Sequence, residues 1–329
     1  MTIRKIAYLF SIGLGFGCSY VHAQDYPAKP IRLIIPFPAG SPSDVLSRLL
    51  APRLTDALKQ PLVVENEPGA AGLVGVASVA KARADGYTLL MGGTGALAII
   101  PNIYTQKRTG YDPITDFSPV SLVANVPFMV AVSPSVPVTS MKALVDLAKS
   151  RPGQLNYASS GVASTPQLAV ELLKSITDIN LTHVPYKGSA PALADLYSGQ
   201  VHLMVTGITS LLPSVKAGKL RALSVADTKR SPLMPDVPTA IEAGIPGFTA
   251  SVWTGLLAPA KTPGSIIALL NRETVKILHS QEIKDRFLGL GADPIGNQAL
   301  QFEAYMREEL QKWGKVVKSL GLNENNVDF

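Results

Sequence analysis

Cysteine is nearly absent from this chain of 329 residues, where Cys18 is the only one. We expect the segment that contains it to be removed, so the mature chain would have no cysteine. That excludes thiolate catalysis, cysteine-ligated metals and disulfides. Beyond this segment no run of 18 apolar residues occurs, which argues against a membrane-spanning helix.

Charged residues are also few, at 16% of the chain, and no dense run of lysine or arginine is present. The formal charge of +6 falls to +4 without Arg4 and Lys5, because 28 basic residues then face 24 acidic ones. The pI of about 9.3 is therefore weak evidence for a nucleic-acid partner, and we expect none. An apolar share of 47% is enough for a large core, and the length suggests two domains.

Catalytic and metal-binding patterns are missing as well. There is no G-x-S-x-G nucleophile motif. His183, His202 and His279 do not have the spacing of metal ligands, so we expect no metal and no cofactor. The adjacent acids Glu308 and Glu309 are interpreted as the solvated face of the last helix.

The first 23 residues have the pattern of a secretory signal peptide. Arg4 and Lys5 precede an apolar segment over 6–16, and Val21-His22-Ala23 is a plausible cleavage site that leaves Gln24 first. Lipid attachment at Cys18 is an alternative, although the residues before Gly17 make a poor lipobox. We therefore expect the mature protein in the periplasm.

The rest of the chain alternates strands and helices. Strands are expected over 31–35, 62–64 and 87–91, with a helix over 43–58 that Pro52 should kink. The pattern restarts further on with helices over 141–149 and 166–175 and strands over 155–158, 181–184, 201–206 and 220–225. Apolar strands separated by helices indicate parallel sheets in an α/β protein.

Two long extended stretches interrupt this alternation, over 118–133 and 248–258. The first is too long for one ordinary strand, so it is either a strand pair or one strand that passes between domains. We expect two lobes, with 24–124 and 251–329 in lobe 1, 125–250 in lobe 2, hinges near Asn125 and Ala250, and a ligand cleft between the lobes. A last helix has one apolar face that includes Phe302 and Trp313, and 323–329 is expected to be a frayed tail.

Three loops between a strand and a helix have the composition of anion-binding sites. Segments 36–44 and 158–167 are rich in small residues, and each opens a helix whose unpaired N–H groups attract anions. In the first, the alternative is that Ser43 or Asp44 serves only as a helix cap. In the second, Pro166 suits a first helical turn. The glycine-rich segment 92–96 offers further N–H groups, although a tight turn explains it equally well.

Many ordered blocks of the sequence resemble one family, the Bug-type receptors of tripartite tricarboxylate transporters, which are periplasmic solute-binding proteins. The similarity covers nearly the whole mature chain. Its blocks include 26–32, 36–40, 64–70, 84–89, 111–113, 155–159, 183–188, 217–223, 235–239, 255–260 and 312–317.

The resemblance implies a type II periplasmic-binding-protein fold in which two α/β lobes, joined by two crossing strands, bind a carboxylate between them without catalysis. It also implies membrane subunits of a tripartite transporter as partners, and we expect a monomer. By motif match the implied ligand-binding residues are Phe37, Ala39, Gly40, Ser41, Ser43, Asp44 as a helix cap, Thr94, Gly95, Ser159, Gly161, Ser164, Thr165 and Thr206.

Several positions depart from the family pattern. Ser41 and Pro42 follow Gly40 where a second glycine is usual, and Ala163 and Gln167 replace a usual glycine and a frequent histidine. Thr206 stands where many relatives carry an acid. A neutral hydroxyl cannot pair with an ammonium group as a carboxylate does. We therefore expect a small organic or aromatic acid without an amino group as the ligand.

Two other functions remain open at this stage. The chain could deliver its ligand to a receptor kinase as a sensor. It could also be an exported hydrolase that uses Ser160 or Ser164, although no catalytic base is evident nearby.

Overall fold

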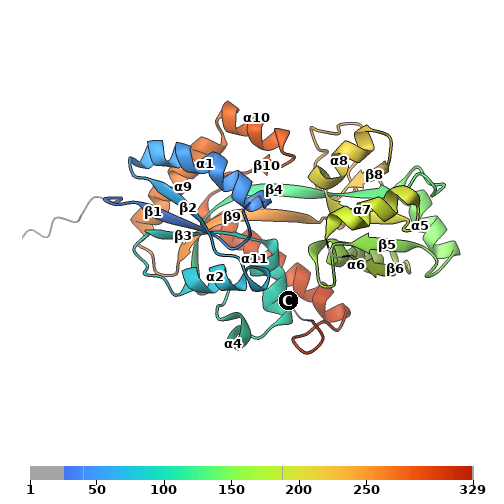
Figure 1. The fold of residues 1–329 in the computed structure, drawn as a ribbon, viewed down its shortest axis with the longest axis horizontal. Coiled ribbons are helices and arrows are strands. Elements are labelled where there is room, and N and C mark those ends of the chain that lie inside the picture. The colour runs from blue at the N-terminus through green and yellow to red at the C-terminus, as the bar shows by residue number, and fades with distance from the viewer. Residues whose placement is uncertain (1–25, 40, 187, 328–329) are drawn as a thin grey trace, which may run out of the picture.

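The computed structural model describes residues 26–39, 41–186 and 188–327 (Figure 1). The signal peptide predicted over 1–23 and the predicted ligand residue Gly40 lie outside the described residues. Figure 1 shows two groups of elements, connected by two strands that run between them.

The first group is built on three parallel strands. They are β1 (Ile31–Ile35), β2 (Leu62–Asn66) and β3 (Thr88–Gly93), with β1 in the middle. The helices of this group are α1 (Pro42–Leu58), α2 (Leu73–Ala80), the short α3 (Ile100–Ile103) and α4 (Gln106–Thr109), and later α9 (Gly264–Leu278), α10 (Gln281–Gly289) and α11 (Ala299–Ser319). A 3₁₀ turn (Ala70–Gly72) precedes α2. The expected strands and helix of this region are confirmed within two or three residues, and Pro52 lies inside α1.

The second group repeats the pattern. Its parallel strands are β5 (Asn156–Ser159), β6 (Thr182–Pro185) and β7 (Leu203–Gly207), and β8 (Arg221–Val225) pairs antiparallel with β4. Its helices are α5 (Met141–Ser150), α6 (Thr165–Thr177), α7 (Ser189–Ser198) and α8 (Ile208–Lys216).

A single strand of 16 residues, β4 (Phe117–Val132), connects the two groups. Its first part pairs antiparallel with β9 (Ser251–Pro259) and with the short β10 (Asp293–Pro294), and its last part pairs with β7 and β8. The extended stretch is therefore one strand that passes between the groups, and not a strand pair. The strand order is β2-β1-β3-β9-β4-β7-β5-β6, so the sheet is mixed where we expected parallel strands alone.

Both faces of the sheet are buried, which explains the nearly continuous apolar runs of its strands. Ile31, Leu33 and Ile35 of β1 point into a cluster with Leu46, Leu50 and Leu54 of α1. Ile34 points the other way, into a cluster with Phe302, Met306 and Trp313 of α11. The predicted apolar face of the last helix is thus the one that covers the sheet.

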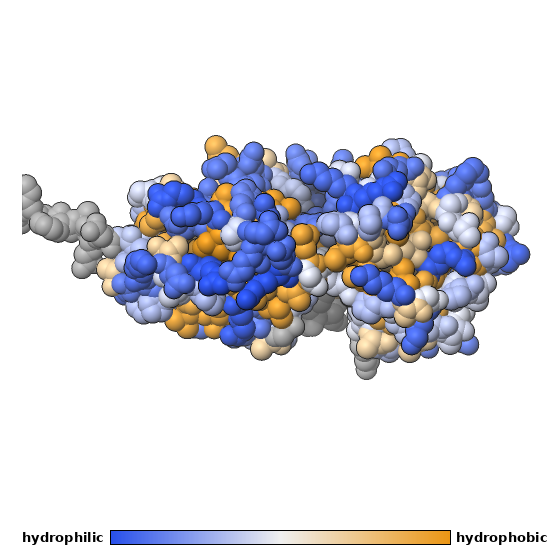
Figure 2. Space-filling view, turned by 90° about the horizontal axis from the view of Figure 1, so that it is seen from above, coloured by the Kyte–Doolittle hydropathy of each residue, from blue (hydrophilic) through white to orange (hydrophobic). Residues whose placement is uncertain are grey.

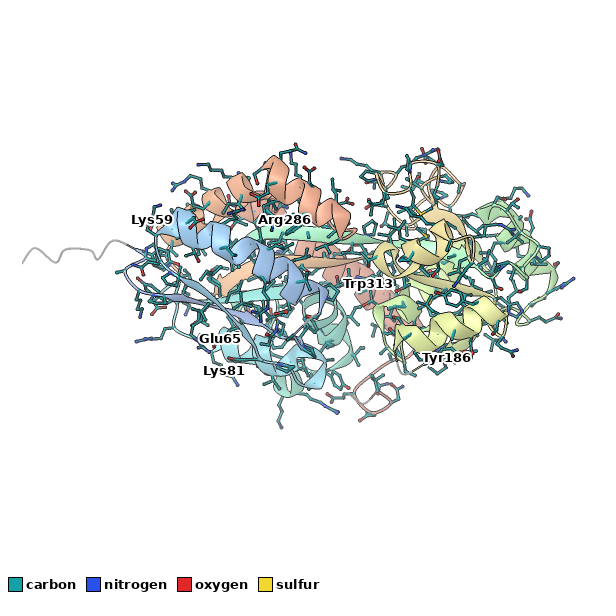
Figure 3. The ribbon with its side chains drawn as sticks, turned by 45° about the horizontal axis from the view of Figure 1, so that its top comes forward. Lys59, Glu65, Lys81, Tyr186, Arg286 and Trp313 are labelled. Atoms are coloured by element: carbon teal, nitrogen blue, oxygen red, sulfur yellow. The ribbon has the colours of Figure 1, made fainter. Side chains whose placement is uncertain are left out.

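The expectation that both acids of α11 face solvent is wrong for Glu309. The residue is 4% exposed, and its carboxylate accepts hydrogen bonds from the indole N–H groups of Trp253 (3.2 Å) and Trp313 (2.9 Å). Lys312 forms an ion pair with the same carboxylate. A buried indole N–H needs an acceptor, and Glu309 lies one turn before Trp313 on the same face. Trp313 is labelled near the middle of the molecule in Figure 3.

The expectation of a frayed tail is also wrong for 323–327. Val327 is buried, and its carbonyl accepts a hydrogen bond from the Tyr104 hydroxyl. The carboxylate of Glu324 accepts a hydrogen bond from Thr105 Oγ1 at 3.1 Å. These contacts attach the end of the described chain to the segment between α3 and α4.

We expect Glu309→Leu to lower the free energy of unfolding by about 3 kcal/mol, because two buried indole N–H groups lose their acceptor. Glu309→Gln keeps an acceptor oxygen and should cost about 1 kcal/mol. The exposed neighbour supplies the control, since Glu308→Gln should stay within about 0.5 kcal/mol of the parent. Urea unfolding measures all three variants, and equal losses at 308 and 309 would contradict the role of Glu309.

Asp293 of β10 should make stability depend on pH. Burial raises the pKa of its carboxyl to about 6, and the nearby Asp227 carboxylate adds to the rise. Because the folded state then favours the protonated form, the contribution of this group to stability should fall as pH rises from about 4 through 6. Urea unfolding across this range should show that Asp293→Asn removes that fall, whereas Asp236→Asn, at an exposed position, should leave it. Parallel profiles for the parent and Asp293→Asn would contradict the assignment.

Candidate functional site

A cavity of about 560 Å³ lies between the two groups of elements. Phe128 of β4 and Val252 of β9 line it, along with Val126 of β4, where the two strands cross between the groups. The remaining lining residues are Phe37, Pro42, Val45, Leu46, Ala71, Gly95, Ile99, Ile100, Leu290 and Ala292 from the first group, and Ser160, Ala163, Ser164, Thr165, Pro166, Ser189, Thr206, Gly207, Thr209 and Ser210 from the second. The size suits a small-molecule ligand.

The first predicted loop, 36–44, contributes Phe37 and Pro42 to the cavity. Ser41 is the N-cap of α1, because its hydroxyl accepts a hydrogen bond from the Asp44 N–H at 3.4 Å. Ser41 itself is not among the lining residues, and Ala39 is exposed.

The prediction that Asp44 caps α1 is wrong. Asp44 lies in the first turn of the helix, where its buried carboxylate accepts hydrogen bonds from Arg48 Nε at 3.0 Å and Asn66 Nδ2 at 3.0 Å. A carboxylate is favourable there because the helix start is partly positive. Ser43 is also turned away from the cavity lining, with its hydroxyl 3.2 Å from that of Thr254.

The glycine-rich segment 92–96 forms the start of a helix and not a tight turn. β3 continues to Gly93, and a five-residue π-helix (Gly95–Ile99) follows, of which Gly95 and Ile99 line the cavity. Thr94 is fully buried, and its hydroxyl accepts a hydrogen bond from the Trp253 N–H at 2.8 Å. Thr94 therefore holds the segment to β9 and does not contribute to the cavity wall.

The loop after β5 forms a compact hydrogen-bonded turn before α6. The Ser159 hydroxyl donates to the Gly161 carbonyl at 2.9 Å and lies 2.7 Å from His183 Nε2. Ser164 is the N-cap of α6, and its hydroxyl donates to the same carbonyl at 2.7 Å. Ser164 and Thr165 line the cavity, while Ser159 and Gly161 shape the loop behind it.

The two residues of this loop that depart from the family pattern, Ala163 and Gln167, are bonded to each other. Ala163 adopts a φ of +58°, the left-handed region that a glycine would enter without strain. Its N–H donates to the side-chain oxygen of Gln167 at 2.6 Å. Gln167 thus supports the strained residue directly, so this chain keeps the loop shape with a different pair of side chains.

His183 does not provide the base that the hydrolase alternative requires. Burial lowers the pKa of its imidazole, and the ring stacks on Tyr157 with centroids 4.8 Å apart. Its partner Ser159 is fully buried, and neither residue lines the cavity. The cavity lining contributed by the described residues contains no titratable side chain.

The sequence analysis identified Thr206 as a site residue but missed the lining residues at the starts of α7 and α8. Thr206 lines the cavity at the end of β7, followed by Thr209 and Ser210 in the first turn of α8. Ser189 occupies the same position at the start of α7. The pattern that could have identified them is a helix that follows a strand, as at segments 36–44 and 158–167.

Within the described residues no group of three histidine, cysteine or acidic side chains is arranged to hold a metal ion. In the same part of the chain, no helix combines the length and the apolar character needed to cross a bilayer.

Comparison with known proteins identifies the family. The family model described as tripartite tricarboxylate transporter family receptor matches residues 46–322. Protein BugT of Bordetella pertussis is 38% identical over 306 residues, which cover 92% of each chain. An R. palustris protein solved with adipate has a TM-score of 0.76 at 38% identity, over 91% of this chain and 99% of that one. MatC from Rhodopseudomonas palustris with bound malate has a TM-score of 0.71 at 32% identity, over 89% and 100%.

These similarities confirm the predicted periplasmic-binding-protein fold, and receptors of this family are solute-binding proteins of the periplasm. The family match spans most of the chain, and the solved relatives align over nearly their full lengths. The chain therefore belongs to the Bug-type receptors of the tripartite tricarboxylate transporter family.

Proposed function

We propose that this protein captures a small carboxylate-bearing solute by closing two lobes around it, and then presents the solute to the membrane subunits of a tripartite transporter. The observation that carries the proposal is the cavity, because both groups of elements line it. The lobes are 24–124 with 251–329, and 125–250. The resemblance to receptors solved with adipate and malate supports a carboxylate as the solute.

The cavity binds the carboxylate without a lysine or arginine from the described residues. Helices α6, α7 and α8 begin at Thr165, Ser189 and Ile208, beside or at lining residues. The free N–H groups at these starts carry partial positive charge, although Pro166 and Pro191 in the first turns of α6 and α7 supply none and the Gln167 N–H donates to Ser164. Together with hydroxyl groups, these N–H groups bind an anion.

Lobe closure depends on the two crossing strands. β4 and β9 are the connections that pass between the groups, so bending near Asn125 and Ala250 changes the distance between the cavity walls. A solute that contacts both walls binds the closed form more tightly than the open form, and this difference drives closure. Residues Phe37, Gly95, Ser164, Thr165 and Thr206 contact the solute, while Ser41, Ser43, Thr94, Ser159 and Gly161 hold the loops in shape.

The proposed protein is a monomeric receptor without catalytic activity, exported by its signal peptide. The absence of a titratable side chain in the described cavity lining supports this, because general acid–base and nucleophilic catalysis require one at hand. The ligand is released unchanged.

We expect one class of carboxylic acids to raise the melting temperature of the mature protein from Gln24 onward. A ligand at about 100 times its dissociation constant adds roughly 2.7 kcal/mol, a shift of a few degrees for a chain of this size. Small-angle X-ray scattering of the same complex should show a smaller radius of gyration. Binding without contraction would contradict lobe closure, and binding with turnover of the acid would contradict the receptor function.

Thr206 should make the protein prefer acids without an amino group. 4-Methylpentanoate should therefore bind at least tenfold more tightly than leucine, because the buried hydroxyl cannot neutralise an ammonium group. Thr206→Asp should reverse the order, and Thr206→Ser should keep it. Titration calorimetry measures all these affinities, and tighter binding of leucine to the parent would refute the role of Thr206.

A further inference from the structure

A short turn of the first group of elements touches the second group beside the cavity. The turn follows α10 and contains Gly291, which lies between the cavity-lining residues Leu290 and Ala292. Gly291 is buried, although Leu290 next to it is 43% exposed. In Figure 1, α10 and α8 lie on the same side of the two connecting strands. Figure 2 views the molecule from that side and shows side chains of the two halves meeting between them.

The backbone of Gly291 has the conformation of a residue that ends a helix. Its φ is +73°, its N–H donates to the Leu288 carbonyl at 2.8 Å, and the Ala292 N–H donates to the Phe287 carbonyl at 3.0 Å. This pattern is common after helices and favours glycine, because a Cβ atom is strained in the left-handed region. Helix termination therefore accounts for the φ of Gly291, but it does not account for the residues that surround it.

The atoms nearest to the missing side chain of Gly291 belong to the other group of elements. A Cβ atom on this residue would lie 2.5 Å from Thr209 Cγ2, and 3.5 Å from Ile208 Cγ2 and Leu233 Cδ1. Ile208 and Thr209 form the first turn of α8, and Leu233 follows β8. A separation of 2.5 Å is far below van der Waals contact, and the β-branched Thr209 has little freedom to turn its methyl group away in a helix. The two groups approach this closely because residue 291 has no side chain.

Gly218 shows that helix termination and close approach are separate properties. It follows the end of α8 with a φ of +69°, and the N–H groups of Gly218 and Lys219 donate to the Val215 and Ser214 carbonyls in the same pattern. A Cβ atom on Gly218 would meet no heavy atom within 4 Å. An alanine at either position therefore has the same backbone strain, but only at position 291 does it collide with the other group of elements.

The contact lies next to the hinge that we predict near Asn125. Gly291 precedes β10 by two residues, and Asp293 of β10 pairs with Asn125 of β4. A displacement close to a hinge corresponds to a large rotation, since the lever arm is short. A methyl group that moves residue 291 away from Thr209 by about 1 Å, to the distance of ordinary contact, therefore moves the far edge of the cavity by more.

We propose that Gly291 is a positioning residue for lobe closure: the lobes meet at this residue beside the hinge, and its missing side chain sets how far they close. Closure to this contact brings the lining residues Leu290 and Ala292 against the start of α8 and completes the cavity. The inference rests on the proposed function and adds the contact that limits closure.

The first experiment tests the contact without a ligand. The mature chain from Gln24 onward contains no cysteine, so Thr209→Cys with Gly291→Cys introduces a single pair. Their Cβ atoms would lie about 4 Å apart or less, which suits a disulfide. We expect diamide to oxidise this pair at least tenfold faster than Thr209→Cys with Gly289→Cys, because a Cβ atom on residue 289 would have no neighbour within 4 Å. Counting free thiols measures both rates, and equal rates would overturn the contact.

The second experiment uses Gly291→Ala to hold the lobes apart. Adipate, malate, benzoate and hexanoate are titrated by calorimetry. For each acid that binds the parent, we expect Gly291→Ala to weaken binding about tenfold, because the closed form becomes a minor population. Gly218→Ala has the same backbone strain and should stay within about twofold of the parent. Thr209→Ser removes the colliding methyl group, so Gly291→Ala in that background should bind within about threefold of Thr209→Ser alone.

Small-angle X-ray scattering separates an effect on closure from a loss of stability. With a bound acid, Gly291→Ala should have a larger radius of gyration than the parent, whereas Gly218→Ala should match it. Melting temperatures without acid show that each variant is folded. Parental affinity of Gly291→Ala, a loss equal to that of Gly218→Ala, or a loss that Thr209→Ser does not relieve overturns the inference and leaves the proposed function intact. If no carboxylic acid binds the parent, the proposed function fails, and the oxidation rates alone decide the inference.

Discussion

The antiparallel pairing of β4 with β9 is the constraint on which the rest of this structure depends. Its register runs from Phe117 opposite Pro259 to Pro127 opposite Ser251, and beyond that point β4 continues into the second group of elements. Strand β9 also holds the segments 36–44 and 92–96 beside the cavity. The Trp253 N–H donates to the Thr94 hydroxyl, and the Thr254 hydroxyl contacts that of Ser43. The strand that connects the two groups of elements therefore also positions the loops beside the cavity. Glu309 extends this arrangement to α11, since its carboxylate joins the indoles of Trp253 and Trp313.

In the proposed function, backbone groups bind the anion in place of basic side chains, and there is a physical reason to use them. A lysine or arginine buried in a closing cleft must lose its hydration, and that cost can exceed the attraction to the ligand. Helix N-termini are held by the rest of the helix and lose little freedom when an anion arrives. The second group of elements repeats one unit three times, a parallel strand followed by a helix whose start borders the cavity. One of these helix starts can be recognised in the sequence, because Pro166 lies in the first helical turn just after Ser164.

Local patterns in the sequence predicted most elements, because strands and helices depend on the spacing of nearby residues. The strands expected over 31–35 and 201–206 and the helices expected over 43–58 and 166–175 follow from such patterns, although the observed cap of the first helix is Ser41 and not Ser43 or Asp44. The errors come from contacts between distant residues. Glu309 looks like a surface acid until Trp253, 56 residues away, is placed beside it. The apolar lining residues were missed for another reason: Leu46 and Ile99 are of the same residue types as the core, and only the fold shows that they border a cavity.

The proposed closure also relates affinity to selectivity. A solute that contacts only one side of the cavity gains little from closure, whereas a solute that contacts both sides stabilises the closed form more than the open form. Each buried CH₂ group contributes about 0.8 kcal/mol, so the length of a hydrocarbon body that packs on lining residues such as Leu46 and Ile99 should set the balance between open and closed forms in small steps.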